Sequence, residues 1–180
     1  MPAAFERTMT YPRKTELSDG TPVLIRPLEP GDRRELVEGF RKLSYQSRRR
    51  RFASPLRRLT RDQLDFLLKI DQVNHVAFGV RDIGHPERPG IAVGRFVRLK
   101  GEPDTAEFAV TVIDAYQNRG LGGLLCRLLM SAAAEQGLRV MRGYVLEDNA
   151  VMIALLRRFG ARLLRESGSM LRAEISLTSD

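Results

Sequence analysis

The chain has 180 residues, a length that suits one domain with a sizeable hydrophobic core. Hydrophobic residues make up 43% of it and charged residues 29%, which is typical of an ordinary folded protein and excludes a disordered chain. The formal net charge of +8 suits anionic partners, such as a phosphorylated cofactor, an acidic surface or a nucleic acid, without choosing among them.

The single cysteine, Cys126, cannot form an intrachain disulfide or a cysteine zinc site, and its place on an apolar helix face is typical of a core residue. His75 and His85 have no partner pattern for metal or triad chemistry, so no metal site is predicted. No apolar run is long enough to span a membrane. Residues 1–14 lack the apolar segment of a signal peptide, so we expect a cytoplasmic protein.

The N-terminal part predicts a tail followed by a single domain. Residues 1–14 are polar and contain two prolines, so we expect a flexible tail there and one domain over residues 15–180. A turn signal at residues 18–21 precedes a strand at residues 23–26. A helix should begin after Asp32, which can cap it, and end near residue 44. Its buried face is predicted to hold Leu36, Val37, Phe40 and Leu43.

Four consecutive arginines, Arg48-Arg49-Arg50-Arg51, follow this helix. Such a run can contact nucleic acid, but neither interleaved aromatic residues nor a repeated basic face accompanies it. We therefore favour a short solvated helix or loop whose guanidinium groups pair with nearby acids. An intermediate alternative is that one or two of these arginines contact a substrate or cofactor phosphate.

The middle of the chain predicts a helix followed by an antiparallel meander. Thr60 and Gln63 form a capping box that opens a helix with Leu64 and Leu67 on one side. The period then changes from helical to strand-like, and three strands are predicted, at residues 75–81, 91–99 and 105–112. The loop at residues 84–90 and the tight turn at residues 100–104 are short, which implies antiparallel pairing.

A glycine-rich turn joins the third of these strands to a long helix that runs to about residue 136. The turn consists of Gln117-Asn118-Arg119-Gly120-Leu121-Gly122-Gly123. A strand end that leads into a helix start aims unpaired backbone N–H groups, and the positive end of the helix dipole, at one spot. Such a spot is suited to binding phosphate.

The C-terminal part completes a mixed sheet. A strand at residues 140–146 follows the long helix, which makes a parallel, right-handed strand–helix–strand crossover. Asp148 or Asn149 can cap a last helix that ends at Gly160. Two closing strands are predicted, at residues 163–166 and 170–177. The sequence therefore predicts one α+β domain with a mixed, mostly antiparallel central sheet and flanking helices.

Three glycine-rich phosphate signatures can be compared with the turn. A dinucleotide fingerprint counted from Gly120 needs glycine at its sixth position, where this chain has Leu125, and a Walker A loop needs Gly-Lys-Ser/Thr, which is absent. The pattern Gln/Arg-x-x-Gly-x-Gly/Ala is matched in full by residues 117–122. With this motif the sequence resembles the GNAT superfamily of N-acetyltransferases, which use acyl-coenzyme A, and the resemblance implies the GNAT fold.

The resemblance covers roughly residues 22–175 and has further support. Val110-x-Val112 before the loop, Asn149 after the next strand and Phe159-Gly160 at the end of the last helix fit the family pattern. Two more segments are similar to the acetyltransferase domain of bacterial protein-lysine acetyltransferases. They are Ile25-Arg26-Pro27-Leu28-Glu29-Pro30-Gly31-Asp32 and Ser44-x-x-Ser47-x-x-x-Arg51-Phe52-x-Ser54-Pro55.

The resemblance implies that acetyl-CoA is the co-substrate. Its pyrophosphate would lie on the backbone amides of residues 119–123, with the Arg119 side chain as an added cation. Its pantetheine arm would add to the preceding strand through the backbone of Val110 and Val112, where an N–H can also hold an oxyanion. Asn149 either bonds the pantetheine or caps its helix. The expected cofactor-binding residues are Val110, Val112, Gln117, Asn118, Arg119, Gly120, Leu121, Gly122, Gly123 and Asn149.

The resemblance also implies a catalytic glutamate. Glu107 matches the place where protein-acetylating family members carry one, although a surface glutamate on a half-exposed strand is the alternative. A lysine amine has a pKa of about 10.4 and is mostly protonated at neutral pH, so Glu107 is expected to act as general base, through water. The tyrosine that many members use as general acid is replaced by Leu156, and Tyr116 and Tyr144 are only nearby alternatives.

The favoured function is transfer of an acetyl group from acetyl-CoA to a primary amine, such as a protein lysine, by direct attack of the amine on the thioester. Two other functions stay open, a catalytically weak acyl-CoA-binding regulatory module and a basic nucleic-acid-binding protein. A homodimer is conceivable because the terminal strands can pair between two copies. No membrane partner is expected.

Overall fold

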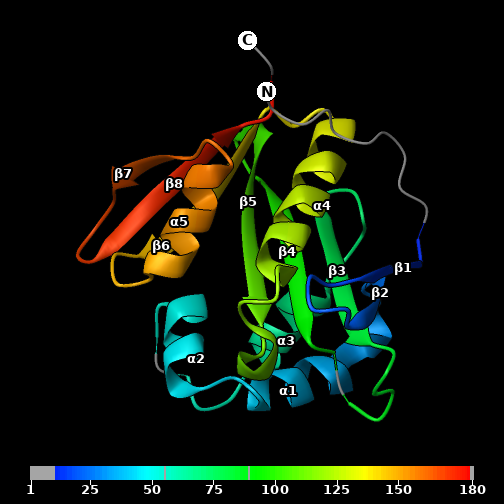
Figure 1. Ribbon diagram of the computed structural model, residues 1–180. Helices are drawn as coiled ribbons and strands as arrows, with labels where there is room; N and C mark the ends of the chain where they lie inside the picture. The colour runs from blue at the N-terminus through cyan, green and yellow to red at the C-terminus, as the bar shows by residue number, and fades with distance from the viewer. Residues whose placement is uncertain (1–10, 55, 89, 179–180) are drawn as a thin grey trace.

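The structure, a computed structural model, describes residues 11–54, 56–88 and 90–178. In that part of the chain, eight strands form one sheet in the order β1-β2-β3-β4-β5-β6-β8-β7, with five α-helices around it (Figure 1). Every neighbouring pair of strands is antiparallel except β5 and β6, which run parallel. The predicted α+β fold with a mixed, mostly antiparallel sheet is confirmed.

The strands are β1 (Arg13–Glu16), β2 (Pro22–Pro27), β3 (His75–Asp82), β4 (Ala92–Leu99), β5 (Glu102–Val112), β6 (Val140–Leu146), β7 (Arg162–Arg165) and β8 (Met170–Ser176). The α-helices are α1 (Arg33–Arg41), α2 (Tyr45–Phe52), α3 (Arg61–Leu68), α4 (Leu121–Glu135) and α5 (Ala150–Arg158). Two short 3₁₀ helices are η1 (Pro30–Asp32) and η2 (Asp114–Tyr116).

Helix α4 packs on one face of the sheet, and α1 and α2 lie against the other face. A Cβ added to Gly94 of β4 would lie 3.2 Å from the side chains of Leu125 and Leu129, so α4 approaches the sheet closely at this point. Successive residues of a strand face opposite sides. Val93 and Arg95 therefore point away from α4, into a cavity that α1 and α2 help to line.

Several predicted features are confirmed. Strands β3, β4 and β5 form the antiparallel meander, and β5, α4 and β6 form the parallel crossover. Thr60 Oγ1 accepts a hydrogen bond from the Gln63 N–H at 3.2 Å, and Gln63 Oε1 accepts one from the Thr60 N–H at 2.8 Å, which completes the capping box. Helices α4 and α5 are followed by Gly137 and Gly160, each with a φ of 75° that favours glycine.

The predicted N-terminal tail extends too far. Residues 1–10 lie outside the described residues, but Arg13 and Lys14 belong to β1 and pair with Ile25 and Leu24 of β2. The turn predicted at residues 18–21 closes this hairpin through a hydrogen bond from the Leu17 N–H to the Thr21 carbonyl at 2.9 Å. Likewise, β5 begins at Glu102, inside the predicted turn, because the register with β4 shifts between residues 98 and 99.

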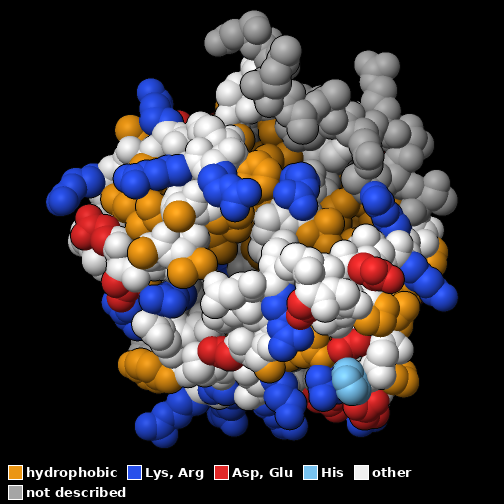
Figure 2. All heavy atoms as spheres, in the orientation of Figure 1, with side chains coloured by type: hydrophobic (Ala, Val, Ile, Leu, Met, Phe, Trp, Pro, Cys, Tyr) orange, Lys and Arg blue, Asp and Glu red, His pale blue; other side chains and the backbone are white. Residues whose placement is uncertain are grey.

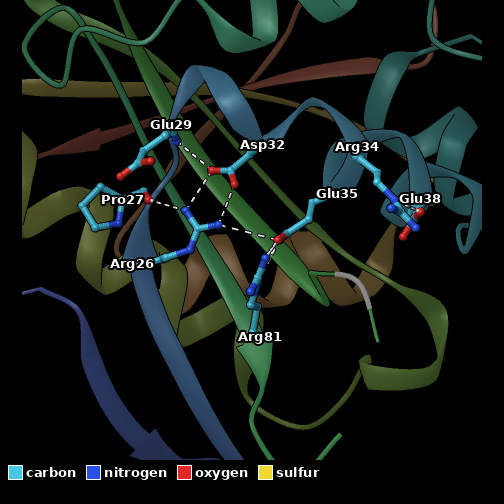
Figure 3. Close-up of polar contacts among 8 residues, drawn as sticks. All are labelled: Arg26, Pro27, Glu29, Asp32, Arg34, Glu35, Glu38 and Arg81. Carbon is cyan, nitrogen blue, oxygen red and sulfur yellow. Dashed lines mark hydrogen bonds and ion pairs between the residues drawn. The ribbon is translucent and has the colours of Figure 1, made fainter. Parts of the chain in front are cut away.

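Asp32 precedes α1 but its side chain does not cap the helix. Its carboxylate instead accepts hydrogen bonds from the Arg26 guanidinium at 2.6 and 2.8 Å and from the Glu29 N–H at 2.7 Å (Figure 3). Glu35 of α1 forms ion pairs with Arg81 of β3 and, at 3.7 Å, with Arg26 of β2. The sequence-based capping prediction is wrong here because a charged guanidinium is a stronger partner than a helix amide.

Candidate functional site

The sheet opens into a cleft between the two parallel strands. Pairing of β5 with β6 ends at Glu107 and Arg142, whereas β5 stays paired with β4 as far as Val112. Beyond Glu107 the two strands separate (Figure 1) and a cleft of about 700 Å³ lies between them. The surface is hollowed between α4 and α5, with Lys and Arg side chains above the hollow (Figure 2).

One edge of β5 faces this cleft. The Ile113 N–H donates to the Ile91 carbonyl at 3.0 Å, so these two residues are a hydrogen-bonded pair of the antiparallel ladder. Because such pairs alternate with non-bonded ones, the backbone groups of Val110 and Val112 point to the other side, toward β6. Both residues line the cleft, and the Val112 carbonyl accepts a hydrogen bond from Gln117 Nε2 at 3.1 Å.

The glycine-rich turn supplies the end of the cleft. Gly120 precedes α4 with a φ of 86°, a conformation that a residue with a Cβ rarely adopts. No side chain caps this helix end, so the N–H groups of its first turn, residues 121–123, lack a side-chain acceptor from the described part of the chain. The residues of the turn that line the cleft are Gln117, Asn118, Gly120, Leu121, Gly122 and Gly123.

The Arg119 side chain is paired outside the cleft, although the sequence predicts it beside the phosphate. It does not line the cleft; its guanidinium forms an ion pair with Asp19 at 3.1 Å and lies 4.8 Å from the centroid of the Tyr116 ring. The structure therefore assigns its side chain to the loop before β2, where Ser18 also donates a hydrogen bond to the Arg119 carbonyl at 3.3 Å. Contact of the Arg119 side chain with a phosphate stays a prediction, and in this structure the guanidinium is paired with Asp19 at the surface.

Asn149 lies at the opposite wall of the cleft, at the start of α5. Its Oδ1 accepts a hydrogen bond from the Met152 N–H at 3.3 Å, so the helix-capping alternative is confirmed. Contact of the same side chain with pantetheine stays a prediction.

Glu107 lies where β5 and β6 separate, at the rim of the cleft, and its side chain is exposed. It faces the same side of the sheet as Thr111 and Arg95, because the register pairs Glu107 with Val97 and Thr111 with Val93. No described residue forms an ion pair or hydrogen bond with its carboxylate, but the nearby Arg51 guanidinium attracts it. The carboxylate is thus free to accept a proton from a group that enters the cleft.

Helix α2, which carries the four arginines, joins the two walls of the cleft. On one side, Arg49 forms an ion pair with Asp148 at 2.6 Å, and Arg50 donates to the Asp148 carbonyl at 3.2 Å. On the other side, Arg51 Nε donates to Thr111 Oγ1 at 3.0 Å. The predicted solvated helix paired with acids is therefore confirmed for Arg49, whereas Arg50 and Arg51 line the cleft.

Two groups that sequence reasoning considered are excluded from proton chemistry in the cleft. The Tyr116 hydroxyl donates to Asp82 at 2.5 Å and accepts from Arg88 at 2.7 Å, so it is already engaged on both sides. Burial raises the pKa of the Cys126 thiol to about 12, which keeps it protonated and unreactive. Tyr144 is 42% exposed and lines the cleft, so it is the tyrosine with access to a substrate.

Among the described residues, no cluster of three or more His, Cys, Asp or Glu side chains is arranged to hold a metal ion. None of the helices that the structure describes has the length and apolar character needed to cross a bilayer.

Comparison with known proteins identifies the family of this cleft. The model of the family described as "Acetyltransferase (GNAT) domain" matches residues 23–162. The chain belongs to the GNAT acetyltransferase family. Acetyltransferase Pat of Mycolicibacterium smegmatis is 31% identical to it over 189 residues, which cover 98% of this chain and 55% of that relative. The GNAT chain thus spans about half the length of this curated relative.

Solved structures agree with this assignment. The GNAT domain of S. lividans PAT superposes on this GNAT chain with a TM-score of 0.83 and 27% identity, covering 91% of this chain and 96% of that one. The yncA protein of Salmonella typhimurium, solved with its cofactor acetyl-CoA, has the same fold with a TM-score of 0.69 at 17% identity, covering 88% and 95% of the two chains. The predicted GNAT fold is confirmed.

The cleft residues that sequence reasoning did not single out include Arg50, Arg51 and Thr111. Thr111 was not singled out because it occupies the unspecified position between Val110 and Val112 of the motif. The signal for Arg51 was its place in the segment from Ser44 to Phe52, which resembles protein-lysine acetyltransferases, but nothing in that segment tells which of four arginines turns inward.

Proposed function

We propose that the protein transfers an acetyl group from acetyl-CoA to a primary amine such as a protein lysine. The observation that carries the proposal is the cleft itself, in which an unpaired edge of β5 leads directly to the uncapped start of α4. Such a cleft fits an elongated ligand that has an amide-containing arm and a phosphate group at one end.

The donor half of the cleft suits coenzyme A in two ways. Backbone N–H groups at residues 121–123, together with the dipole of the 15-residue helix α4, would hold the pyrophosphate, a contribution of up to about 2 kcal/mol in a partly buried site. The backbone of Val110 and Val112 would bond the amide groups of pantetheine as an added strand does. The yncA protein, which shares this fold, was solved with acetyl-CoA, and this supports the same donor here.

The chemistry would begin with removal of a proton from the acceptor. Glu107 accepts the proton of the ammonium group, directly or through one water, and the free amine attacks the thioester carbonyl. A backbone N–H of the exposed β5 edge stabilises the oxyanion that forms. The nitrogen of the tetrahedral intermediate then loses its second proton, and the carbon–sulfur bond breaks to yield an amide and the thiolate of coenzyme A. That proton reaches the sulfur through water or Tyr144, and Glu107 releases its own proton to solvent.

Glu107→Gln tests this assignment. The substitution keeps the shape and removes the base, so turnover should fall by about a hundredfold or more while acetyl-CoA affinity stays close to the wild-type value. Turnover is measured as release of free thiol from acetyl-CoA, and affinity by calorimetry. Glu16→Gln, at an exposed site on the distant edge strand β1, is the matched control. Unchanged turnover in Glu107→Gln would sink the assignment.

A catalytically weak regulatory module that binds acyl-CoA is the second candidate, and one observation favours it. Leu156 occupies the position of the family's tyrosine acid, is 2% exposed and cannot donate a proton. Retained acetyl-CoA binding without thiol release, across small amines, peptides and proteins, would favour this candidate over the enzyme.

A further inference from the structure

A second, smaller cavity lies on the face of the sheet that carries α1 and α2. Its volume is about 70 Å³, and helices α1 and α2 cover it. Since about 10–15 Å³ of such volume holds one water molecule, a carboxylate group with one or two waters fits inside. Leu43, Arg51 and Thr111 line both this cavity and the large cleft, so these residues form the boundary between the two adjacent spaces.

Two guanidinium groups line this cavity. Arg95 of β4 is 5% exposed, donates to the Leu67 carbonyl at 2.7 Å and lies 3.1 Å from His75 Nε2. Arg51 of α2 is partly buried and bonds Thr111. Neither forms an ion pair with any residue that the structure describes, which is unusual because buried charges are normally paired.

The electrostatics of the pair indicate that the two charges are close enough to repel each other, with the Glu107 carboxylate as a partial counter-charge to Arg51. Burial, and then the neighbouring Arg51 charge, lower the pKa of Arg95 to about 9. Burial also lowers the pKa of Arg51, against the attraction of Glu107. The pKa of His75 is lowered by burial and then by Arg95, and an imidazole supplies no negative counter-charge in either protonation state. An anion between the two guanidiniums would stabilise both charged forms.

An acidic residue that lines the cavity is already neutralised. Glu35 also lines the space, but its carboxylate forms ion pairs with Arg81 and Arg26. The Arg26 guanidinium forms a further ion pair with Asp32 (Figure 3). The lining of the cavity therefore includes one carboxylate that is already paired and two guanidiniums that form no ion pair with a described residue.

The two guanidiniums lie beside the proposed base. Glu107 and Arg95 are diagonal neighbours on one face of the β4–β5 pair, since Glu107 opposes Val97 and Arg95 opposes Ala109. The Cβ atoms of such neighbours are about 7–8 Å apart. An acceptor whose amine faces Glu107 can therefore reach the guanidiniums with a group only a few bonds away.

We infer that Arg51 and Arg95 form a carboxylate-binding subsite for the acceptor, so that the preferred acceptor is an amine with a carboxylate a few bonds from it. This inference rests on the proposed function and deepens it. Two sources share the chemistry, a free amino acid and a lysine beside an acidic residue of a peptide or protein. A planar guanidinium binds a carboxylate through two parallel hydrogen bonds, and two guanidiniums offer more donors than one carboxylate needs.

The test compares acceptors that differ only in the carboxylate. Thiol release is measured with 3-aminopropanoate and 5-aminopentanoate against propylamine and pentylamine, and with a peptide lysine beside aspartate against the same peptide with asparagine. We expect kcat/KM to be about tenfold or more higher for the carboxylate member of at least one pair. An advantage for the small acids indicates a free amino acid, and an advantage for the peptide indicates an acidic neighbour.

The variants Arg51→Gln and Arg95→Met should each remove most of that advantage, chiefly by raising KM for the carboxylate acceptor, while acetyl-CoA affinity changes little. Arg34→Gln is the matched control: it removes the same charge from α1, but its side chain is 89% exposed and bonds Glu38, so the advantage should persist. If Arg95→Met fails to fold, the presence or loss of the carboxylate advantage in Arg51→Gln alone still tests the inference. Equal kcat/KM within every wild-type pair would overturn the inference.

A binding measurement separates this inference from the proposed function. The midpoint of thermal unfolding is recorded with 5-aminopentanoate and with pentylamine as probes, with no turnover required. Stabilisation by the amino acid alone, lost in Arg51→Gln, supports the subsite even if no acceptor releases thiol, in which case only the proposed function fails. Equal effects of the two probes, with normal thiol release from neutral amines, would reject the subsite and leave the proposed function intact.

Discussion

Cys126 shows how burial decides the chemistry of a single residue. Its side chain is fully buried on α4, and its raised pKa keeps the thiol protonated at neutral pH. We expect Cys126→Ala to retain turnover within about twofold, because direct attack of an amine needs no enzyme nucleophile. The native protein should not react with a thiol reagent, and the unfolded chain should react with its one cysteine. Rapid modification of the native protein, or loss of turnover in Cys126→Ala, would contradict this.

Gly143 fixes the point where the two parallel strands separate. A Cβ at this residue of β6 would lie 2.9 Å from Cε1 of Phe108 of β5, a ring that is itself 6% exposed. Gly143→Ala should therefore destabilise the fold by about 1–3 kcal/mol, as overpacking of a core does. Urea unfolding measures the loss. Gly31→Ala is the control, since no atom lies within 4 Å of a Cβ there; equal stabilities of the two variants would refute the explanation.

At the scale of elements, α2 is held by polar contacts together with one apolar contact, the packing of Phe52 against Phe40 of α1. None of its eight residues is fully buried, and so short a helix is not stable by propensity alone. At its start, Asp114 of η2 accepts hydrogen bonds from the Ser44 N–H at 2.8 Å and from the Ser47 hydroxyl at 3.0 Å. The position of Arg51 in the cleft thus depends on contacts that involve a titrating group.

The stability that α2 gains from its hydrogen bonds to Asp114 should depend on pH. Burial alone would raise the pKa of Asp114, but the hydrogen bonds from Ser44 and Ser47 outweigh it and hold the pKa below its usual value. A carboxylate with a lowered pKa in the folded state stabilises above its unfolded pKa, and this stability is lost as pH falls through the folded value. We expect Asp114→Ala to cost about 1 kcal/mol at pH 6.

The difference in unfolding free energy between wild type and Asp114→Ala is measured in urea at pH 6 and at pH 3. It should shrink at the lower pH, because pH 3 lies below the usual pKa of an aspartate, so the unfolded chain binds a proton there and the stability that the carboxylate contributes begins to be lost. A difference that stays constant between these two values would show that the carboxylate charge contributes nothing to the position of α2.

At the scale of the whole molecule, the proposed donor half of the site could be predicted from the sequence and the proposed acceptor half could not. Residues 117–123 are contiguous, and their strand-to-helix transition is visible in the periodicity of the flanking segments. The pair formed by Arg51 and Arg95 joins α2 to β4 and exists only through tertiary packing. A buried arginine also contradicts the ordinary expectation that charged residues lie outside. Strand β1 was missed for a related reason, since its pairing with β2 and not its own pattern defines it.

The net charge of +8 carries the last prediction. On the face shown in Figure 2, a row of Lys and Arg side chains runs above the hollow, and the acidic side chains lie mostly below it. Many of the basic side chains are paired, as with Glu174, which lies within ion-pair distance of Arg142, Arg162 and Arg172. We expect any binding of duplex DNA to consist of non-specific contacts with phosphate, for which dissociation constants are about 10⁻⁴ to 10⁻⁶ M at physiological salt.

We therefore expect a mobility shift with duplex DNA at low salt that disappears near about 0.15 M salt, since screening and counterion release remove the attraction between unpaired surface charges and phosphates. Acetyl-CoA binding, measured over the same salt series, should weaken far less. Its pyrophosphate would be held by backbone N–H groups inside the cleft, and these are screened less than exposed side chains. Tight binding of DNA that persists at physiological salt, together with a loss of acetyl-CoA affinity as steep as that for DNA, would support a nucleic-acid-binding function instead.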